Sequence, residues 1–265
     1  MCIRDSFKGK LVVVTGASSG LGREIARILA YREGANLVVT ARRRERLEEL
    51  KAEIESRSAS RVYVVQVDLA DPAGADVLFK EATAHGDVFA LISNAGVTYY
   101  GKTLDGRIRD YEQIINVNFM SVVRSCMLFL PYFLDRGTGA LLTVTSFTAL
   151  SPAPYQTVYS ASKHATQAFM EGLAQEYKGR GVVFCTFAPG GMATEMNTKS
   201  GTDKKHPLDS PVNMDAGKVA RIAVRGFKKG KLCAVPGLMY KTASLVIRFV
   251  PRSVLGAVVE RIFQP

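Results

Sequence analysis

The stretch Leu11–Gly22 reads L-V-V-V-T-G-A-S-S-G-L-G and joins a short apolar run to three glycines, Gly16, Gly20 and Gly22. The apolar run predicts a buried strand, and the residues after the glycines predict a helix. Glycines at such a turn let the backbone bend sharply and let a pyrophosphate approach the helix N-terminus. Free N–H groups and the helix dipole favour an anion there. The stretch therefore predicts a dinucleotide-binding turn, with a tight turn that binds no ligand as the alternative.

The rest of the chain alternates short apolar runs with longer helical patterns, which is typical of an open sheet covered by helices on both faces. We expect strands at Lys10–Thr15, Asn36–Ala41, Arg61–Val67, Val88–Ser93, Ala140–Thr145 and Val182–Phe187. We expect helices at Leu21–Arg32, Arg44–Ser56, Ala73–Ala84, Ile108–Leu134 and Val158–Lys178. The pattern predicts an α/β fold: one Rossmann-type, doubly wound parallel sheet over residues 7–236, with residues 237–265 as an apolar, basic helical extension of the same domain.

Two segments depart from the alternation. Thr194–Pro211 is polar and contains glycine and proline, which predicts a loop, and a long loop after a strand often covers a binding site. Gly237–Pro265 is apolar and basic, and Pro251 divides it into halves too short to span a bilayer. We favour helices that pack on the core or on another subunit. The alternative is an amphipathic segment that rests on a membrane surface.

The net charge is +11 and the sequence pI is about 9.6. Such a charge suits a phosphorylated cofactor, an acidic membrane or nucleic acid, and equally an ordinary basic surface. No nucleic-acid motif is present, so we expect no nucleic-acid partner. The histidines and cysteines show no metal-ligand spacing, and we expect no metal site. The first apolar run has only four residues, too few for a signal peptide. We expect a cytoplasmic location, with membrane association through residues 237–265 as the alternative.

The end of the second expected strand reads T-A-R-R-R and carries a cofactor preference. Sites that prefer NAD usually place an acid here for the ribose 2′-hydroxyl, whereas an arginine suits the 2′-phosphate of NADP. Ala41 stands where the acid is expected, and Arg42 and Arg43 follow. Positive charge is disfavoured at a helix start, and a bound phosphate would remove that conflict. We therefore predict NADP(H) rather than NAD(H).

Tyr159 and Lys163 lie four residues apart in Y-S-A-S-K, so one helical face carries both side chains. A free tyrosine has a pKa of about 10 and is a poor base at neutral pH. A nearby cation favours the phenolate. Ser146 ends the fifth expected strand, at the sheet edge where such folds bind ligands, and its hydroxyl can bond a substrate oxygen. These three residues predict proton transfer to or from an oxygen atom.

The sequence closely resembles the classical short-chain dehydrogenase/reductase family from Lys8 to about Thr194. The motifs that carry the resemblance are T-G-A-S-S-G-L-G, V-D-L at Val67–Leu69, S-N-A-G at Ser93–Gly96, N-V-N at Asn116–Asn118, Ser146, Y-S-A-S-K and P-G-G-M-A-T at Pro189–Thr194. Ser93 departs from the family's usual asparagine. The resemblance implies a catalytic role for Asn118, Ser146, Tyr159 and Lys163, with Tyr159 as general acid or base. Lys163 would lower the pKa of Tyr159 and bond the nicotinamide ribose, and Asn118 would hold a relay water.

The resemblance also implies the cofactor contacts. They are Gly16, Ser18, Ser19, Gly20, Leu21, Gly22, Arg42, Arg43, Asp68, Leu69, Asn94, Ala95, Gly96, Tyr159, Lys163, Pro189, Gly190, Met192 and Thr194. Taken singly, Asn118, Ser146 and Asp68 could equally be a helix kink, a strand-end cap and a turn residue.

The implied activity is NADPH-dependent carbonyl reduction, or alcohol oxidation in reverse. The tail resembles that of reductases of lipophilic substrates, which suggests a fatty, sterol-like or sphingoid ketone and a place in lipid metabolism. A homodimer or homotetramer paired through Ile108–Leu134 and Val158–Lys178 is implied as well. The alternatives are a non-catalytic NADP-binding sensor or scaffold and a membrane-surface protein that uses the tail.

Overall fold

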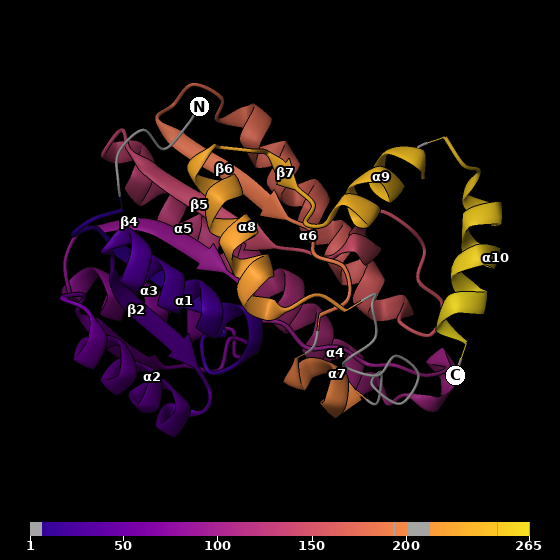
Figure 1. The fold of residues 1–265 in the computed structure, drawn as a ribbon, viewed down its shortest axis with the longest axis horizontal. Helices are drawn as coiled ribbons and strands as arrows, with labels where there is room; N and C mark the ends of the chain where they lie inside the picture. Colours follow the sequence, from indigo (N-terminus) through magenta and orange to yellow (C-terminus); the bar gives the residue numbers. More distant parts are fainter. Residues whose placement is uncertain (1–6, 193, 201–212, 248, 265) are drawn as a thin grey trace.

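The computed structural model describes residues 7–192, 194–200, 213–247 and 249–264. These residues form one seven-stranded parallel sheet in the order β3-β2-β1-β4-β5-β6-β7 (Figure 1). The strands are β1 Leu11–Thr15, β2 Asn36–Ala41, β3 Val62–Gln66, β4 Val88–Ser93, β5 Gly139–Val144, β6 Val182–Phe187 and β7 Cys233–Ala234. The predicted fold class is confirmed, and the six predicted strands are present with bounds shifted by one residue at most.

Helices flank the sheet in two layers. They are α1 Gly20–Glu33, α2 Arg44–Arg57, α3 Gly74–Ala84, α4 Ile108–Ile115, α5 Ser121–Asp135, α6 Thr157–Glu176, α7 Glu195–Ser200, α8 Ala216–Lys228, α9 Leu238–Val246 and α10 Arg252–Phe263. Short turns lie at η1 Thr103–Asp105, η2 Asn116–Met120 and η3 Phe147–Ala149. Strand residues alternate between two cores: Val12 and Val14 face α1, α2 and α8, whereas Leu11 and Val13 face α3, α5 and α6.

The segment Ile108–Asp135 is a continuous helical run long and apolar enough to cross a membrane, but half of its apolar window is buried. Phe129 and Phe133 pack in the second core, so the core covers part of the apolar surface of this run. The predicted helix Ile108–Leu134 is therefore present. Its middle, η2, is a π turn rather than an α turn.

Chain order reverses at β1, which pairs with β2 on one side and β4 on the other. In such sheets ligands bind beyond the carboxyl ends of the strands at this reversal. The two ends are Thr15 and Ser93. The topology thus brings the glycine-rich turn next to the S-N-A-G motif.

Three elements were not predicted. The strand β7 has only two residues, too few to show a pattern. The helix α8 follows a segment in which no strand was expected, so the strand–helix alternation did not predict it. The predicted loop Thr194–Pro211 begins as the helix α7, because Glu195 suits a helix N-terminus and Asn197 returns to bond the Met192 carbonyl. The rest of that loop, including His206, lies outside the described residues, as does Arg248 in the tail.

Candidate active site

The glycine-rich turn lies against the end of β4. Gly16 and Gly20 have φ angles of +67° and +54°, which side-chain-bearing residues rarely adopt. A Cβ atom on Gly22 would lie 2.4 Å from Asn94 Nδ2. Asn94 Nδ2 donates to the Thr15 carbonyl at 2.9 Å, and the Ala95 N–H donates to Thr15 Oγ1 at 3.0 Å. The turn therefore requires glycine because it packs closely against Asn94 and Ala95, whether or not a ligand is bound.

The N-terminus of α1 is open to an anion. Ser19 precedes the helix with extended backbone, and its side chain makes no capping hydrogen bond. The first N–H groups of a helix lack intrahelical partners, so these donors suit a phosphate. The residues present fit a dinucleotide pyrophosphate.

Arg43 lies over the glycine-rich turn. Its Nη2 donates to Ser18 Oγ at 3.1 Å and to Ser19 Oγ at 3.0 Å. Its Nη1 pairs with Glu195 Oε2 at 2.8 Å. Arg42 lines the same cavity but is exposed. The charge conflict expected at the start of α2 is thus relieved within the protein by Glu195, a partner that sequence reasoning did not foresee.

Asp68 and Leu69 line the cavity beyond β3. Asp68 Oδ1 accepts from the Ala70 N–H at 2.9 Å, so this residue shapes a turn as well. Leu69 is buried beside it. The turn role and the predicted contact with the cofactor are compatible, because a carboxylate has a second oxygen.

The predicted proton-transfer residues meet in the cavity beyond β5. Ser146 starts η3, and its Oγ accepts from the Thr148 N–H at 3.2 Å, so it is a cap as well. The Ser146 hydroxyl interacts with the Tyr159 phenol and acts to lower the pKa of that phenol. Lys163 Nζ donates to the Val144 carbonyl at 3.0 Å and lies 5.8 Å from the centre of the Tyr159 ring. Helical spacing on α6 and the end of β5 bring these side chains together.

Burial controls the proton affinity of this cluster. It raises the pKa of the Tyr159 phenol, and the interaction with Ser146 acts in the opposite direction. Burial also lowers the pKa of the Lys163 ammonium, to about 8. Sequence reasoning expected the lysine to lower the pKa of Tyr159, whereas in the protein alone burial dominates, because desolvation disfavours the phenolate.

Asn118 lies in the π turn η2 and is buried. Its Oδ1 accepts from the Val97 N–H at 2.9 Å, and its Nδ2 donates to the Val97 carbonyl at 2.9 Å and to Ser162 Oγ at 3.0 Å. A Cβ atom on Gly96 would lie 3.4 Å from Asn118 Oδ1 and 3.6 Å from Lys163 Nζ. Asn118 therefore braces the strand-β4 loop immediately beside Lys163.

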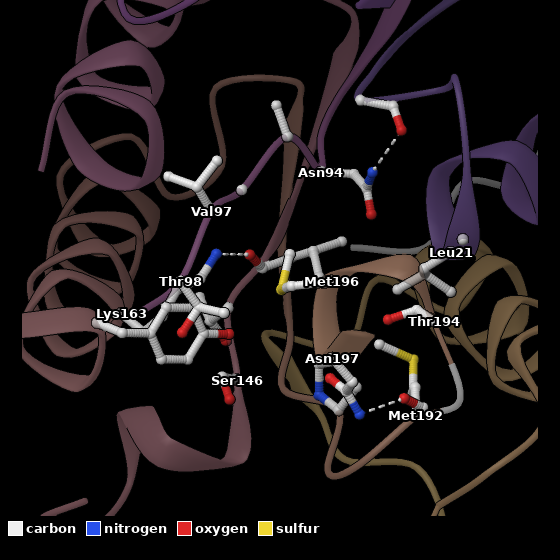
Figure 2. Close-up of a pocket in the computed structure, with 18 of the residues that line it drawn as sticks. Leu21, Asn94, Val97, Thr98, Ser146, Lys163, Met192, Thr194, Met196 and Asn197 are labelled. Carbon is white, nitrogen blue, oxygen red and sulfur yellow. Dashed lines mark hydrogen bonds between the residues drawn. The ribbon is translucent and has the colours of Figure 1, made fainter. Parts of the chain in front are cut away.

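The described residues of the P-G-G-M-A-T motif line the same cavity. The Pro189 carbonyl accepts from the Phe147 N–H at 2.8 Å, and the Thr194 methyl lies 3.3 Å from where a Cβ on Gly20 would be. Met192 lines the cavity. Figure 2 shows Ser146 and Lys163 on one side of the cavity and Met192 and Thr194 on the other. All the predicted site residues except Gly22 and Asn118 line one cavity. Asn118 contacts Val97, which is part of that lining. Gly22 lies directly behind the lining residues Asn94 and Gly16.

The structure adds residues that the motifs did not indicate. Met239, Tyr240 and Val259 reach the cavity from α9 and α10. Tyr240 OH accepts from the Gly191 N–H at 3.0 Å, and its ring packs edge-on against Phe147 at 5.1 Å. The fragment G-L-M-Y gave no signal for such a contact, because the pairing spans about fifty residues of sequence.

The cavity has a volume of about 680 Å³. Its cofactor end and its proton-transfer end define a nucleotide-dependent redox site. The family model described as short chain dehydrogenase matches residues 10–205. The chain belongs to the short-chain dehydrogenase/reductase family, a family of oxidoreductases.

Similar proteins agree with this assignment. Dehydrogenase/reductase SDR family member 7B of Danio rerio is 33% identical over 209 residues, covering 75% of this chain and 66% of that protein. Very-long-chain 3-oxoacyl-CoA reductase-B of Danio rerio is 33% identical over 215 residues, covering 79% and 67%. The chain thus spans about two thirds of the length of each of these two relatives. A short-chain dehydrogenase from Sphingobium yanoikuyae in complex with NADPH superposes with a TM-score of 0.80 at 26% identity, covering 92% and 97%.

The Tyr240 contact leads to a steric prediction. A Cβ atom on Gly190 would lie 2.1 Å from Tyr240 Cζ, so Gly190→Ala should destabilise the protein by about 1–3 kcal/mol. Adding Tyr240→Ala to that variant should recover part of the loss. Urea denaturation followed by circular dichroism measures both effects. Gly172→Ala, on α6 with nothing within 4 Å of the added methyl, is the control, and a double variant no more stable than Gly190→Ala contradicts the coupling.

Proposed function

We propose that this protein is an NADPH-dependent carbonyl reductase, or an alcohol dehydrogenase in the reverse direction, acting on a lipophilic substrate. The observation that carries the proposal is the placement of Ser146, Tyr159 and Lys163 in the same cavity as Arg43 and the glycine-rich turn. A nicotinamide bound there would supply the hydride to the carbonyl carbon. The cofactor-bearing end is fixed by α1 and Arg43, which leaves the Ser146 end for the substrate.

The proton-transfer side follows from the protein's own groups. The Ser146 hydroxyl can hold the substrate oxygen while charge develops on it. The Tyr159 phenol donates its proton to the same oxygen, and its raised pKa keeps it in the protonated form that reduction requires. The charged Lys163 stabilises the phenolate left behind. Asn118 holds Val97 and Ser162 in place and, with its remaining lone pair, is suited to a relay water.

The substrate end supports an apolar molecule. Phe147, Met196, Met239 and Val259 contribute to its lining, and apolar linings with a few placed polar groups are typical of small-molecule sites. The name of the Danio rerio relative, very-long-chain 3-oxoacyl-CoA reductase, also supports a lipophilic substrate. We propose a fatty, sterol-like or sphingoid ketone, with lipid metabolism as the setting.

The proposal includes a homodimer or homotetramer paired through α4–α5 and α6. Met127 and Ile108 on that helical run are exposed large apolar side chains, which is consistent with a contact between copies.

Tyr159→Phe is expected to lower kcat by at least about a hundredfold, because it removes the general acid. NADPH affinity, followed by nicotinamide fluorescence, should change little. Tyr155→Phe is the matched control: Tyr155 lies two residues before α6, outside the cavity lining, and this substitution should leave kcat near the wild-type value. Retention of most activity by Tyr159→Phe rejects the mechanism.

Arg43→Ala should weaken NADPH binding by roughly ten- to a hundredfold, since it removes charge-assisted hydrogen bonds to a phosphate. NADH binding should stay the same. Parallel fluorescence titrations with the two cofactors measure the effect, with Arg46→Ala, an exposed arginine of α2 outside the cavity lining, as the control for charge alone. An equal loss of NADPH and NADH affinity would show that Arg43 only supports the turn.

The pH dependence of carbonyl reduction should follow Lys163. As pH rises through about 8, Lys163 loses its charge, so kcat/KM for reduction should fall, while Tyr159 with its raised pKa stays protonated. Because kcat/KM reports groups of the free enzyme, a pH series of initial rates at low ketone concentration tests this directly. A profile that stays flat through that region speaks against the role of Lys163.

A further inference from the structure

Exposed apolar side chains gather on α9 and α10. Of thirteen large apolar side chains exposed among the described residues, seven lie in this pair of helices and the segment that joins them. No residue of the fully described helix α9 is buried, and Leu255 is the one buried side chain among the described positions of α10. The tail therefore packs on the core only in part. The predicted alternative, packing on another subunit, stays a prediction.

The exposed apolar side chains of α9, of the turn after it and of α10 are here called the tail face. Leu238 and Leu245 are 79% and 55% exposed, and their spacing of seven residues aligns them along one side of α9. Phe249, which is 89% exposed, lies in the turn that follows the helix. Met239 and Val246 form the adjacent row. On α10, Val254 and Val258 are exposed one turn apart. Figure 1 shows α10 at the edge of the molecule, far from the central strands.

Basic residues border this apolar face. Lys241 lies one turn from both Leu238 and Leu245, and Arg252 and Arg261 lie at the two ends of α10; all three are exposed. Glu260 is the one acidic residue in the sequence of residues 237–265. Apolar rows bordered by cations are the pattern of helices that lie in the plane of a membrane interface. α9 and α10 have 9 and 12 residues, which is too short to span a bilayer.

We propose that the tail face docks on an anionic phospholipid bilayer. Each basic residue near such a surface is attracted by the negative lipids, and the apolar rows enter the boundary between head groups and acyl chains. A second copy of the chain is a poorer occupant. A two-fold interface would bring this patch against itself and set Lys241, Arg252 and Arg261 against the same cations, with Glu260 as the single acid to balance them.

Docking would place the substrate end of the cavity at the membrane. Tyr240 and Val259 line the cavity from the two helices that carry the tail face. A lipophilic ketone could then enter from the bilayer without crossing water. This consequence rests on the proposed function, whereas the binding itself does not.

The test is co-sedimentation of the full chain with phosphatidylcholine vesicles, with and without phosphatidylglycerol. We expect binding to the phosphatidylglycerol vesicles, weakened by high salt. Leu245→Glu/Phe249→Glu should abolish it, and Lys241→Glu/Arg252→Glu should lower the partition coefficient by at least about fivefold for each charge. Val77→Glu, an exposed apolar position on α3, is the control and should bind as the wild type does.

Failure of the wild type to bind anionic vesicles overturns the proposal, as does equal loss of binding in Val77→Glu. Sedimentation velocity without lipid distinguishes the competing occupant: if Leu245→Glu/Phe249→Glu converts an oligomer to a smaller species, the face is a subunit interface and the proposal is wrong. NADPH titration of each variant reports the cofactor site separately. Loss of vesicle binding with unchanged NADPH affinity supports the membrane surface, whatever the fate of the proposed reaction.

Discussion

The close approach between the β1–α1 turn and the end of β4 is the contact on which the site depends. Thr15 Oγ1 accepts from the N–H groups of the two residues that follow β4, and the Thr15 carbonyl accepts from Asn94 Nδ2. Glycine at positions 16 and 22 is the condition for this approach, because a methyl group at either would meet protein atoms within 3 Å. Once the two strand ends are joined, the α1 N-terminus and Gly96 take up fixed positions around the crevice.

A low local dielectric then determines the chemistry. Ser146, Tyr159 and Lys163 are all buried or enclosed at the end of β5, and burial acts on the acid and on the cation in opposite directions. The phenol holds its proton more firmly and the ammonium holds its proton less firmly. The same environment that makes phenol ionisation difficult also strengthens every hydrogen bond offered to a substrate oxygen.

The sequence predicted the sheet and the motif-bearing turns because both are local. Continuous apolar runs such as Val88–Ser93 indicate buried parallel strands, and the glycine and Y-S-A-S-K spacings act within one or two turns of chain. β7 has two residues and no such pattern. The partners of Arg43 and Tyr240 are Glu195 and Gly191, at long sequence separation. No sequence periodicity predicts such pairs. The contacts of Arg43 with Glu195 and of Tyr240 with Gly191 therefore become apparent only in the folded structure.

The π turn at Asn116–Met120 has a consequence for the phase of its helix. A π turn holds one residue more than an α turn, and one residue corresponds to a rotation of about 100°. Asn118 must point at Val97, while Phe129 and Phe133, on the same continuous run, must point at the sheet. A regular helix keeps a single phase from end to end. The extra residue rotates the two halves of the helix relative to each other. Asn118 can therefore face Val97 beside the crevice while Phe129 and Phe133 face the core.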